Sequence, residues 1–116
     1  MNPLLRKLNR VHLVGIGGVG MEGLARYLGS VGISVQGSDF LDSQTLKLLS
    51  EDGFKTWSFH DPSHVEQMDL VIYSAAVRKE NPELIAAKKM GIGLISRAEF
   101  VGEISRWHET ISVAGT

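Results

Sequence analysis

The chain has 116 residues, a length that suits one domain built around one hydrophobic core. Twelve Lys and Arg against thirteen Asp and Glu leave a formal charge of -1, so no basic surplus predicts nucleic-acid binding. The lack of cysteine excludes a disulfide scaffold, a thiolate nucleophile and a Cys-ligated metal, and the apolar fraction of 43% argues against disorder. No apolar run is long enough to predict a signal peptide or a membrane span, so we expect no membrane partner.

Short apolar runs recur along the chain and predict strands. We expect these strands at 11–14, 33–37, 54–59, 69–73 and 92–95, with a further one beginning at 110–114. That last strand stands at the end of the chain, where a strand–helix unit would be expected to continue. The sequence therefore predicts a piece of a longer protein.

Amphipathic stretches separate the strands and predict helices. The starts are marked by capping residues: Asp42, Ser63, Asn81 followed by a proline, and Ser96. Residues 21–28 give a further helix, with apolar side chains at i, i+3, i+4 and i+7. Strand–helix alternation with short connections predicts a three-layer α/β/α fold, with helices on both faces of a mainly parallel sheet of about five strands.

A glycine-rich loop lies between the first strand and the first long helix. Gly15, Gly17 and Gly20 match the G-x-G-x-x-G pattern of Rossmann-like folds. In that pattern Gly15 allows a tight turn, Gly17 lets the backbone approach a phosphate, and Gly20 lets the helix pack close to the sheet. Free N–H groups at the helix start then attract a diphosphate.

Two further features follow the loop. Asp39, nineteen residues after Gly20, stands where this fold places an acidic contact to ribose, although it can equally cap a turn. Residues 73–77 end the fourth strand with small side chains. Spacing alone leaves two interpretations of that stretch open, a ligand-facing edge or a plain strand exit.

Several stretches, in this order and spacing, resemble the amino-terminal domain of the Mur ligases. They are 12–21, 37–39, 60–61, 74–77, 81–83, 97–99 and 113–116. The resemblance is strongest to the branch of the family that joins L-alanine to UDP-N-acetylmuramate, and the intact Gly-Ile-Gly-Gly loop favours this branch over the murein tripeptide ligases. In this family, Ala-Gly-Thr leads into an ATP-binding phosphate loop. The present sequence contains Ala-Gly-Thr at residues 114–116, so the resemblance places that loop just beyond residue 116.

The resemblance implies that residues 1–116 form a single UDP-sugar-binding domain of a cytoplasmic bacterial ligase. ATP, Mg²⁺ and L-alanine would be bound by central and carboxyl-terminal domains outside this chain, so we expect no cofactor and no catalysis here. The residues that it implies for UDP-N-acetylmuramate are Gly15, Ile16, Gly17, Gly18, Val19, Gly20, Met21, Ser38, Asp39, His60, Ser74, Ala75, Ala76 and Arg97.

Other interpretations remain open. The glycine loop and Asp39 equally suit an NAD(P)-binding domain of an oxidoreductase or a nucleotide-sensing module. Arg97 suits either the anionic sugar end of the ligand or a structural ion pair. His60 and His64 are four residues apart, but Pro62 lies between them and no third ligand is evident, so we predict no metal site. We expect His12 to pack in the core or to make a backbone hydrogen bond rather than to act in catalysis, and residues 79–80 to form a solvated face.

Overall fold

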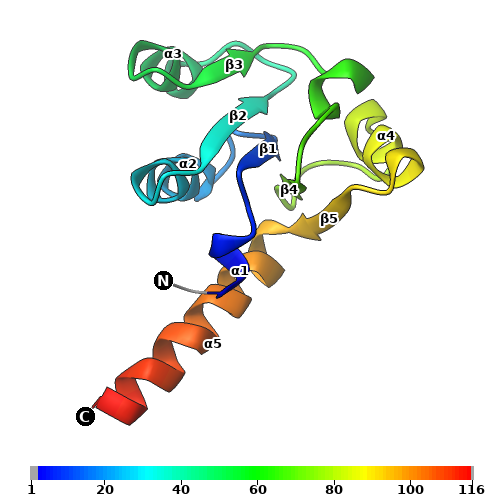
Figure 1. Ribbon diagram of the computed structural model, residues 1–116. Coiled ribbons are helices and arrows are strands. Elements are labelled where there is room, and N and C mark those ends of the chain that lie inside the picture. Colours follow the sequence, from blue (N-terminus) through cyan, green and yellow to red (C-terminus); the bar gives the residue numbers. More distant parts are fainter. Residues whose placement is uncertain (1–2, 116) are drawn as a thin grey trace.

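The computed structural model describes the backbone of residues 3–115 and the side chains of residues 3–106. Five strands alternate with helices along the chain (Figure 1). The elements are α1 (Pro3–Arg6), β1 (Arg10–Val14), α2 (Met21–Ser30), β2 (Ser34–Ser38), α3 (Gln44–Glu51), β3 (Lys55–Trp57), the 3-10 helix η1 (Pro62–Val65), β4 (Leu70–Tyr73), α4 (Pro82–Met90), β5 (Gly93–Ser96) and α5 (Arg97–Gly115).

All neighbouring strands pair in parallel, in the order β3-β2-β1-β4-β5. The chain moves outward from β1 to β3 on one side, then returns to the other side of β1 with β4 and β5 (Figure 1). The strand order therefore reverses between β1 and β4. In open α/β sheets, ligands bind at such a switch point, outside the carboxyl ends of the strands.

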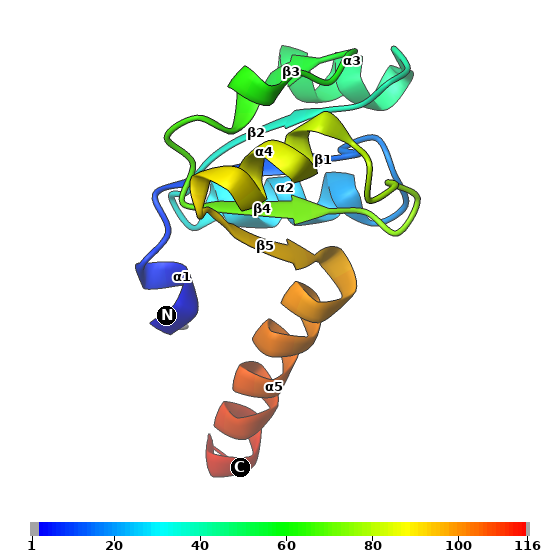
Figure 2. The ribbon, with the colours of Figure 1, turned by 90° about the vertical axis from the view of Figure 1, so that its right-hand side faces the viewer.

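Helices cover both faces of the sheet, as the sequence predicted. On one face, Leu28 of α2, Leu49 of α3 and Phe100 of α5 pack with Leu13 of β1 in the larger core cluster. On the other face, α4 packs over β1 and β4, with Leu84 contributing to a second cluster (Figure 2). The three-layer α/β/α architecture is confirmed.

The central strand β1 is buried on both sides because it has a neighbouring strand on each edge and helices on each face. Leu13 belongs to the larger core cluster and Val14 to the cluster under α4. Side chains alternate along a strand, so His12 shares the α4 side with Val14. A fully buried polar side chain on the most central strand requires hydrogen-bond partners.

One predicted element is wrong. Residues 110–114 belong to α5, which leads away from the sheet, and do not form a sixth strand (Figure 2). A strand there would need the free edge of a neighbouring strand for its hydrogen bonds, whereas a helix makes them within its own backbone.

The capping residues were predicted in part. Asn81 caps α4 with Pro82 in its first turn, and the Ser96 hydroxyl accepts from the N–H of Glu99 at 3.2 Å, both as predicted. However, α3 is capped by Ser43 rather than Asp42, because the Ser43 side chain reaches the N–H three residues on. The predicted cap at Ser63 is also wrong: Asp61 caps η1, and its carboxylate accepts from the N–H of residue 63.

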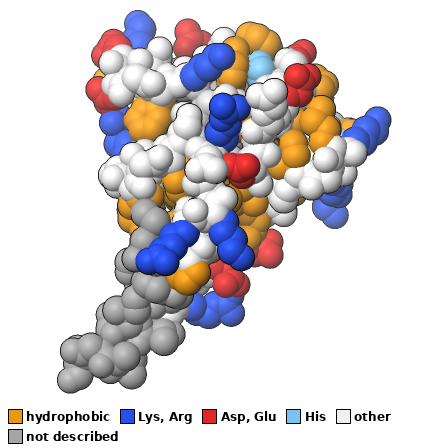
Figure 3. Space-filling model, in the orientation of Figure 1, with side chains coloured by type: hydrophobic (Ala, Val, Ile, Leu, Met, Phe, Trp, Pro, Cys, Tyr) orange, Lys and Arg blue, Asp and Glu red, His pale blue; other side chains and the backbone are white. Residues whose placement is uncertain are grey.

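The surface mixes charges of both signs, as Figure 3 shows for one face of the molecule. This fits the formal net charge of -1. Among the described residues, no helix combines the length and the apolar character that a bilayer span requires.

Candidate functional site

A cleft of about 1220 Å³ lies at the carboxyl edge of the sheet, where the strand order reverses. It is enclosed by the loops that follow β1, β2 and β4, together with one residue after β3. The lining residues are Gly15, Gly17, Gly18, Asp39, Phe40, His60, Ser74, Ala76, Val77, Arg78, Lys79, Glu80 and Asn81. The topology thus brings the glycine loop, the acidic residue and the 74–77 stretch to one cavity.

The turn at Gly15 has a geometry that requires glycine. Its φ is +81°, a left-handed conformation that residues with a Cβ rarely adopt. A Cβ there would lie 2.8 Å from Oγ of Ser74 and 2.9 Å from Cγ2 of Val77. The tight turn predicted for Gly15 is confirmed, and the bare backbone brings the loops after β1 and β4 together.

Gly17 lies directly against Asp39. The Gly17 N–H donates to Oδ2 of Asp39 at 2.9 Å, and a Cβ on Gly17 would lie 2.8 Å from the same oxygen. Oδ1 accepts from the N–H of Phe40 at 2.8 Å. Each carboxylate oxygen has two lone pairs, so Asp39 supports the glycine loop and can still accept from a ligand hydroxyl.

The start of α2 has no side-chain cap. Gly20 is its N-cap, with φ +78°; the Met21 N–H donates to the carbonyl of Gly18 at 3.1 Å, and the next two N–H groups of the helix have no partner among the described residues. The Arg97 guanidinium lies over this residue, since a Cβ on Gly20 would be 3.1 Å from its Cζ. The helix dipole and the guanidinium together favour negative charge at this point.

The role predicted for Gly20 in helix–sheet packing is not supported, because the atoms nearest to a Cβ there belong to the side chain of Arg97. A different close approach occurs at Gly37 of β2, where an added Cβ would collide with the side chain of Ile16 in the glycine loop. The G-x-G-x-x-G pattern fits this chain, but Gly20 does not have the packing role that the pattern predicts.

The predicted site residues divide into groups by burial. Ile16, Met21 and Ser38 have buried side chains, so only their backbone groups can face a ligand from the loop or the strand end. Val19 is 95% exposed, and Ala75 is exposed beside the cleft without lining it. Gly15, Gly17, Gly18, Asp39, His60, Ser74 and Ala76 line the cleft, whereas Gly20 and Arg97 do not.

Six cleft residues are absent from the predicted set of site residues: Phe40, Val77, Arg78, Lys79, Glu80 and Asn81. Arg78 and Lys79 line the cavity, although residues 79–80 were interpreted as a solvated face. Phe40, 71% exposed, also lines it. Their positions were a usable signal, because Phe40 directly follows Asp39 and the two basic residues follow β4 at the carboxyl edge of the sheet.

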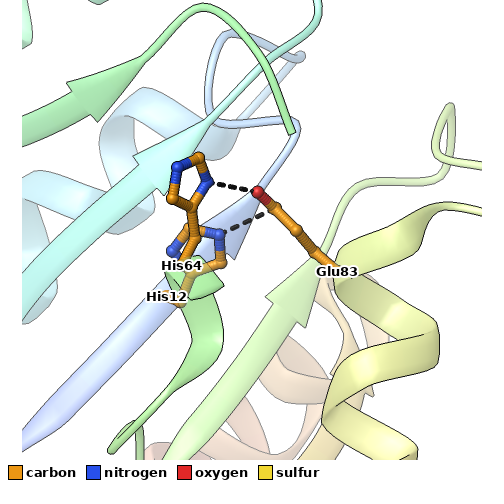
Figure 4. Close-up of side chains that lie close together, drawn as sticks. All are labelled: His12, His64 and Glu83. Carbon is orange, nitrogen blue, oxygen red and sulfur yellow. Dashed lines mark hydrogen bonds and ion pairs between the residues drawn. The ribbon is translucent and has the colours of Figure 1, made fainter. Parts of the chain in front are cut away.

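A buried polar cluster lies beside the cleft, centred on the carboxylate of Glu83 in the first turn of α4 (Figure 4). Oε1 accepts from Nε2 of His12 at 2.8 Å and from the Ser38 hydroxyl at 2.5 Å. Oε2 accepts from Nδ1 of His64 at 2.6 Å and from the N–H of Asp61 at 3.0 Å. The cluster therefore ties α4 to β1, β2 and η1.

Glu83 is ionised in this cluster. Burial alone would raise its pKa, but the hydrogen bonds from His12 and Ser38 outweigh it and lower the pKa from 4.5 to about 2.

Burial lowers the pKa of His12, against the raising effect of Glu83, so its ring is neutral at pH 7. The Gln36 amide donates to Nδ1 of His12 at 2.9 Å and to the carbonyl of His64 at 2.6 Å, so the His12 proton is on Nε2.

The cluster also has the composition of a metal site. Ligand atoms of His12, His64 and Glu83 lie within 4.8 Å of one another, so His64 does have the partners that the sequence analysis did not find. These atoms are already hydrogen-bonded to each other, and no buried side-chain N or O among the described residues lacks a partner. Trp57 stacks on the His64 ring, with centroids 3.8 Å apart. A hydrogen-bonded core cluster accounts for the arrangement.

Comparison with known proteins gives a consistent result. The family described as "Mur ligase family, catalytic domain" matches residues 10–108. The chain is 41% identical to the UDP-N-acetylmuramate--L-alanine ligase of Methylobacterium radiotolerans and 44% identical to that of Persephonella marina. Each match covers 95% of this chain, which spans only 24% of either relative. The crystal structure of UDP-N-acetylmuramate-alanine ligase from Thermotoga maritima superposes with a TM-score of 0.80 at 30% identity, over 84% of this chain and 23% of that one.

Proposed function

Because the chain belongs to the Mur ligase family, we propose that it is the UDP-N-acetylmuramate-binding domain of an ATP-dependent ligase. The ligase would add L-alanine to this UDP-sugar in the cytoplasm of a bacterium, as a step of peptidoglycan synthesis. The domain itself would position the nucleotide-linked substrate, so that the sugar's carboxylate reaches ATP held elsewhere. The proposal for the amino acid rests on the names of relatives that are 41% and 44% identical.

The observation that carries the proposal is the convergence of three features on one cleft. The bare turn at Gly15 and Gly17, the carboxylate of Asp39 and the small residues after β4 all line it. The start of α2 suits a diphosphate, because the N–H groups of Glu22 and Gly23 make no hydrogen bond within the described residues, and Asp39 retains acceptor capacity for ribose hydroxyls. Arg78 and Lys79 add positive charge to the lining, next to the carboxylate of Glu80.

ATP and Mg²⁺ do not fit the residues of this chain. A phosphate loop of that class needs a lysine followed by a Ser or Thr hydroxyl after its last glycine, and the sequence contains no Gly-Lys-Ser or Gly-Lys-Thr. Gly20 is followed by Met21 and Glu22 instead. We therefore assign no step of the ligation to these residues beyond holding and orienting the UDP-sugar.

Two other functions share part of this geometry. A nicotinamide-binding domain uses the same glycine turn and the same acidic residue, but the matched relatives are named as ligases and support the UDP-sugar. A ligase that attaches a murein tripeptide is the alternative within the family. The 41% and 44% identity to alanine-adding enzymes supports L-alanine.

Binding to the purified 116-residue chain tests the proposal. Thermal unfolding is followed with UDP-N-acetylmuramate, UDP and NADH at matched concentrations. A ligand at about 100 times its Kd should stabilise the fold by about 2.7 kcal/mol. We expect both uridine compounds to raise Tm, and NADH to leave it unchanged. A shift with NADH alone would reject the proposal in favour of an oxidoreductase domain.

A glycine variant locates the binding site. In Gly17→Ala the new Cβ would lie 2.8 Å from Oδ2 of Asp39, so either the carboxylate or the loop must move, and the contact between Gly17 and Asp39 is lost. We expect the UDP shift to disappear while the unliganded chain stays folded. Gly102→Ala is the matched control, because a Cβ there meets nothing within 4 Å, and it should keep the full shift. An unchanged UDP shift in Gly17→Ala would place the diphosphate elsewhere.

A further inference from the structure

His60 connects the buried cluster with the cleft. Its Nδ1 lies 2.9 Å from the Ser38 hydroxyl and 3.3 Å from Oε1 of Glu83. The side chain is 13% exposed, and the residue lines the cleft. The two edges of one imidazole ring therefore face different surroundings, a buried carboxylate on one side and the ligand cavity on the other.

The hydrogen bonds fix which ring nitrogen of His60 carries the proton. Ionised Glu83 can only accept, and Ser38 lies 2.5 Å from it, so the single hydroxyl proton of Ser38 is donated to Oε1. The Ser38 oxygen can then only accept from His60. Both neighbours of Nδ1 are thus acceptors, which requires a proton on Nδ1.

The other ring nitrogen faces the cleft. Nε2 of His60 has no hydrogen-bond partner among the described residues, and no buried side-chain nitrogen there lacks one, so this atom is accessible to solvent. Because the ring lines the cleft, the accessible edge is the cavity edge. In a neutral ring with its proton on Nδ1, Nε2 carries a lone pair and accepts hydrogen bonds.

We propose that Glu83 is a positioning residue which, through Ser38, holds His60 with its proton on Nδ1, so that Nε2 accepts a hydrogen bond from the nucleoside half of the ligand. This inference rests on the proposed nucleotide site. A diphosphate has only acceptors at neutral pH and is excluded as the partner of this lone pair. Uridine offers two kinds of donor, the imide N3–H of the base and the ribose hydroxyls.

The tautomer is measured directly on the ligand-free chain labelled with ¹⁵N. Two-bond ¹H–¹⁵N spectra near pH 7.5 distinguish protonated from unprotonated ring nitrogens. We expect His60 and His64 with the proton on Nδ1, and His12 with the proton on Nε2 as an internal reference of the opposite kind. A His60 ring with its proton on Nε2 in the wild-type chain would overturn the inference. This result needs neither a variant nor a bound ligand.

Two variants test the link to the ligand. In Glu83→Gln the amide oxygen should face the donors at His64 and Asp61, leaving the NH₂ group toward Ser38. The Ser38 proton would then turn to Nδ1 of His60, which moves the ring proton to Nε2. His60→Ala removes the acceptor outright. We expect each variant to weaken UDP binding by about twofold to tenfold, the value of one hydrogen bond.

The double variant separates positioning from general structural damage. If Glu83 acts through His60, Glu83→Gln adds no further loss of affinity in the His60→Ala chain. If the fold-losses of UDP affinity in the two single variants multiply in the double variant, the two residues act independently and the inference is wrong. Glu83→Asp keeps a carboxylate, and we expect it to retain the Nδ1-protonated ring; the Nε2-protonated form in this variant would contradict the role of the charge.

Ligand analogues identify the donor. 3-Methyluridine diphosphate lacks the imide N–H, and 2′,3′-dideoxyuridine diphosphate lacks both ribose hydroxyls. The analogue without the relevant donor should bind wild type and His60→Ala equally well. If both analogues still bind His60→Ala more weakly, Nε2 is not the acceptor. Failure of wild type to bind UDP would reject the proposed function, whereas a wrong tautomer in a UDP-binding chain rejects this inference alone.

Discussion

Oε1 of Glu83 lies 2.8 Å from Nε2 of His12, although 71 residues separate them in the chain and neither side chain is exposed. The pair joins the first turn of α4 to the centre of the sheet. A buried carboxylate is costly unless hydrogen bonds satisfy its lone pairs, and here five donor groups lie within 3.3 Å of its two oxygens. The cluster therefore couples stability to pH beside the cleft.

Acidification should destabilise the chain through Glu83. Its pKa falls from 4.5 to about 2 on folding, so its contribution is fully present above pH 4.5 and is lost as the pH falls toward 2. A shift of this size corresponds to about 3 kcal/mol. The lowered pKa of His12 acts in the same direction from about pH 6.5 downward, because the unfolded chain takes up that proton first. Urea unfolding between pH 8 and pH 2.5 measures the loss.

The Glu83→Gln variant isolates this contribution. At pH 7 it should be less stable than wild type by about 2–4 kcal/mol, because the amide NH₂ faces buried donors. The two stability curves should converge as the pH falls and wild-type Glu83 becomes protonated. Glu51→Gln, at the exposed end of α3, serves as the control and should follow wild type throughout. Parallel curves for Glu83→Gln and wild type would show that Glu83 is not the acid-sensitive group.

Glycine substitutions should have opposite effects at two positions close in sequence. Gly15→Ala forces a Cβ into a left-handed turn and within 2.8 Å of Ser74, so we expect a loss of about 2–3 kcal/mol. Gly23→Ala lies inside α2, where a Cβ meets nothing within 4 Å, and should stabilise the chain by about 0.5–1 kcal/mol. Chemical unfolding of both variants gives the comparison. A neutral Gly15→Ala would contradict the tight turn.

The local elements of the fold were predictable because they depend on local signals. The pairing of Asn81 with Pro82 gave the start of α4, and alternating apolar runs gave the five strands. The sixth strand at 110–114 was wrong because an apolar, β-branched run is equally compatible with the end of a helix. The order of the strands is set by packing between distant segments, which no local pattern encodes.

The site was predictable where a motif has fixed spacing. Gly15, Gly17 and Asp39 meet in the cleft because the loop after β1 and the end of β2 are adjacent in any such sheet. The buried cluster was missed because His12 and Glu83 belong to elements brought together only by tertiary packing. His12 was expected to pack in the core, and it does so as a hydrogen-bond donor.

Arg97 should contribute to ligand binding more than to stability. Among the described side chains it makes no ion pair, which disfavours the structural alternative, and its guanidinium lies over the uncapped start of α2. We expect Arg97→Ala to weaken UDP-N-acetylmuramate binding about tenfold, while Tm of the free chain changes little. Calorimetric titration and thermal unfolding measure the two. A large drop in Tm with unchanged affinity would restore the structural role.

The basic residues after β4 should make nucleotide binding depend on salt. Lys79 lines the same cleft as the glycine loop, so we expect its ammonium to interact with a bound diphosphate. Lys79→Ala should weaken UDP binding by about threefold to tenfold at low salt, and the difference from wild type should shrink as added salt screens the charge.

Lys88→Ala provides the matched control for Lys79→Ala. Lys88 is an exposed lysine in the last turn of α4 and does not line the cleft. It carries the same charge, so its removal changes the net charge equally while leaving the cavity intact. We expect UDP titrations at 50 and 500 mM salt to show the wild-type affinity and salt dependence for Lys88→Ala. Equal effects of the two substitutions would mean that only the overall charge of the molecule acts, and would remove Lys79 from the site.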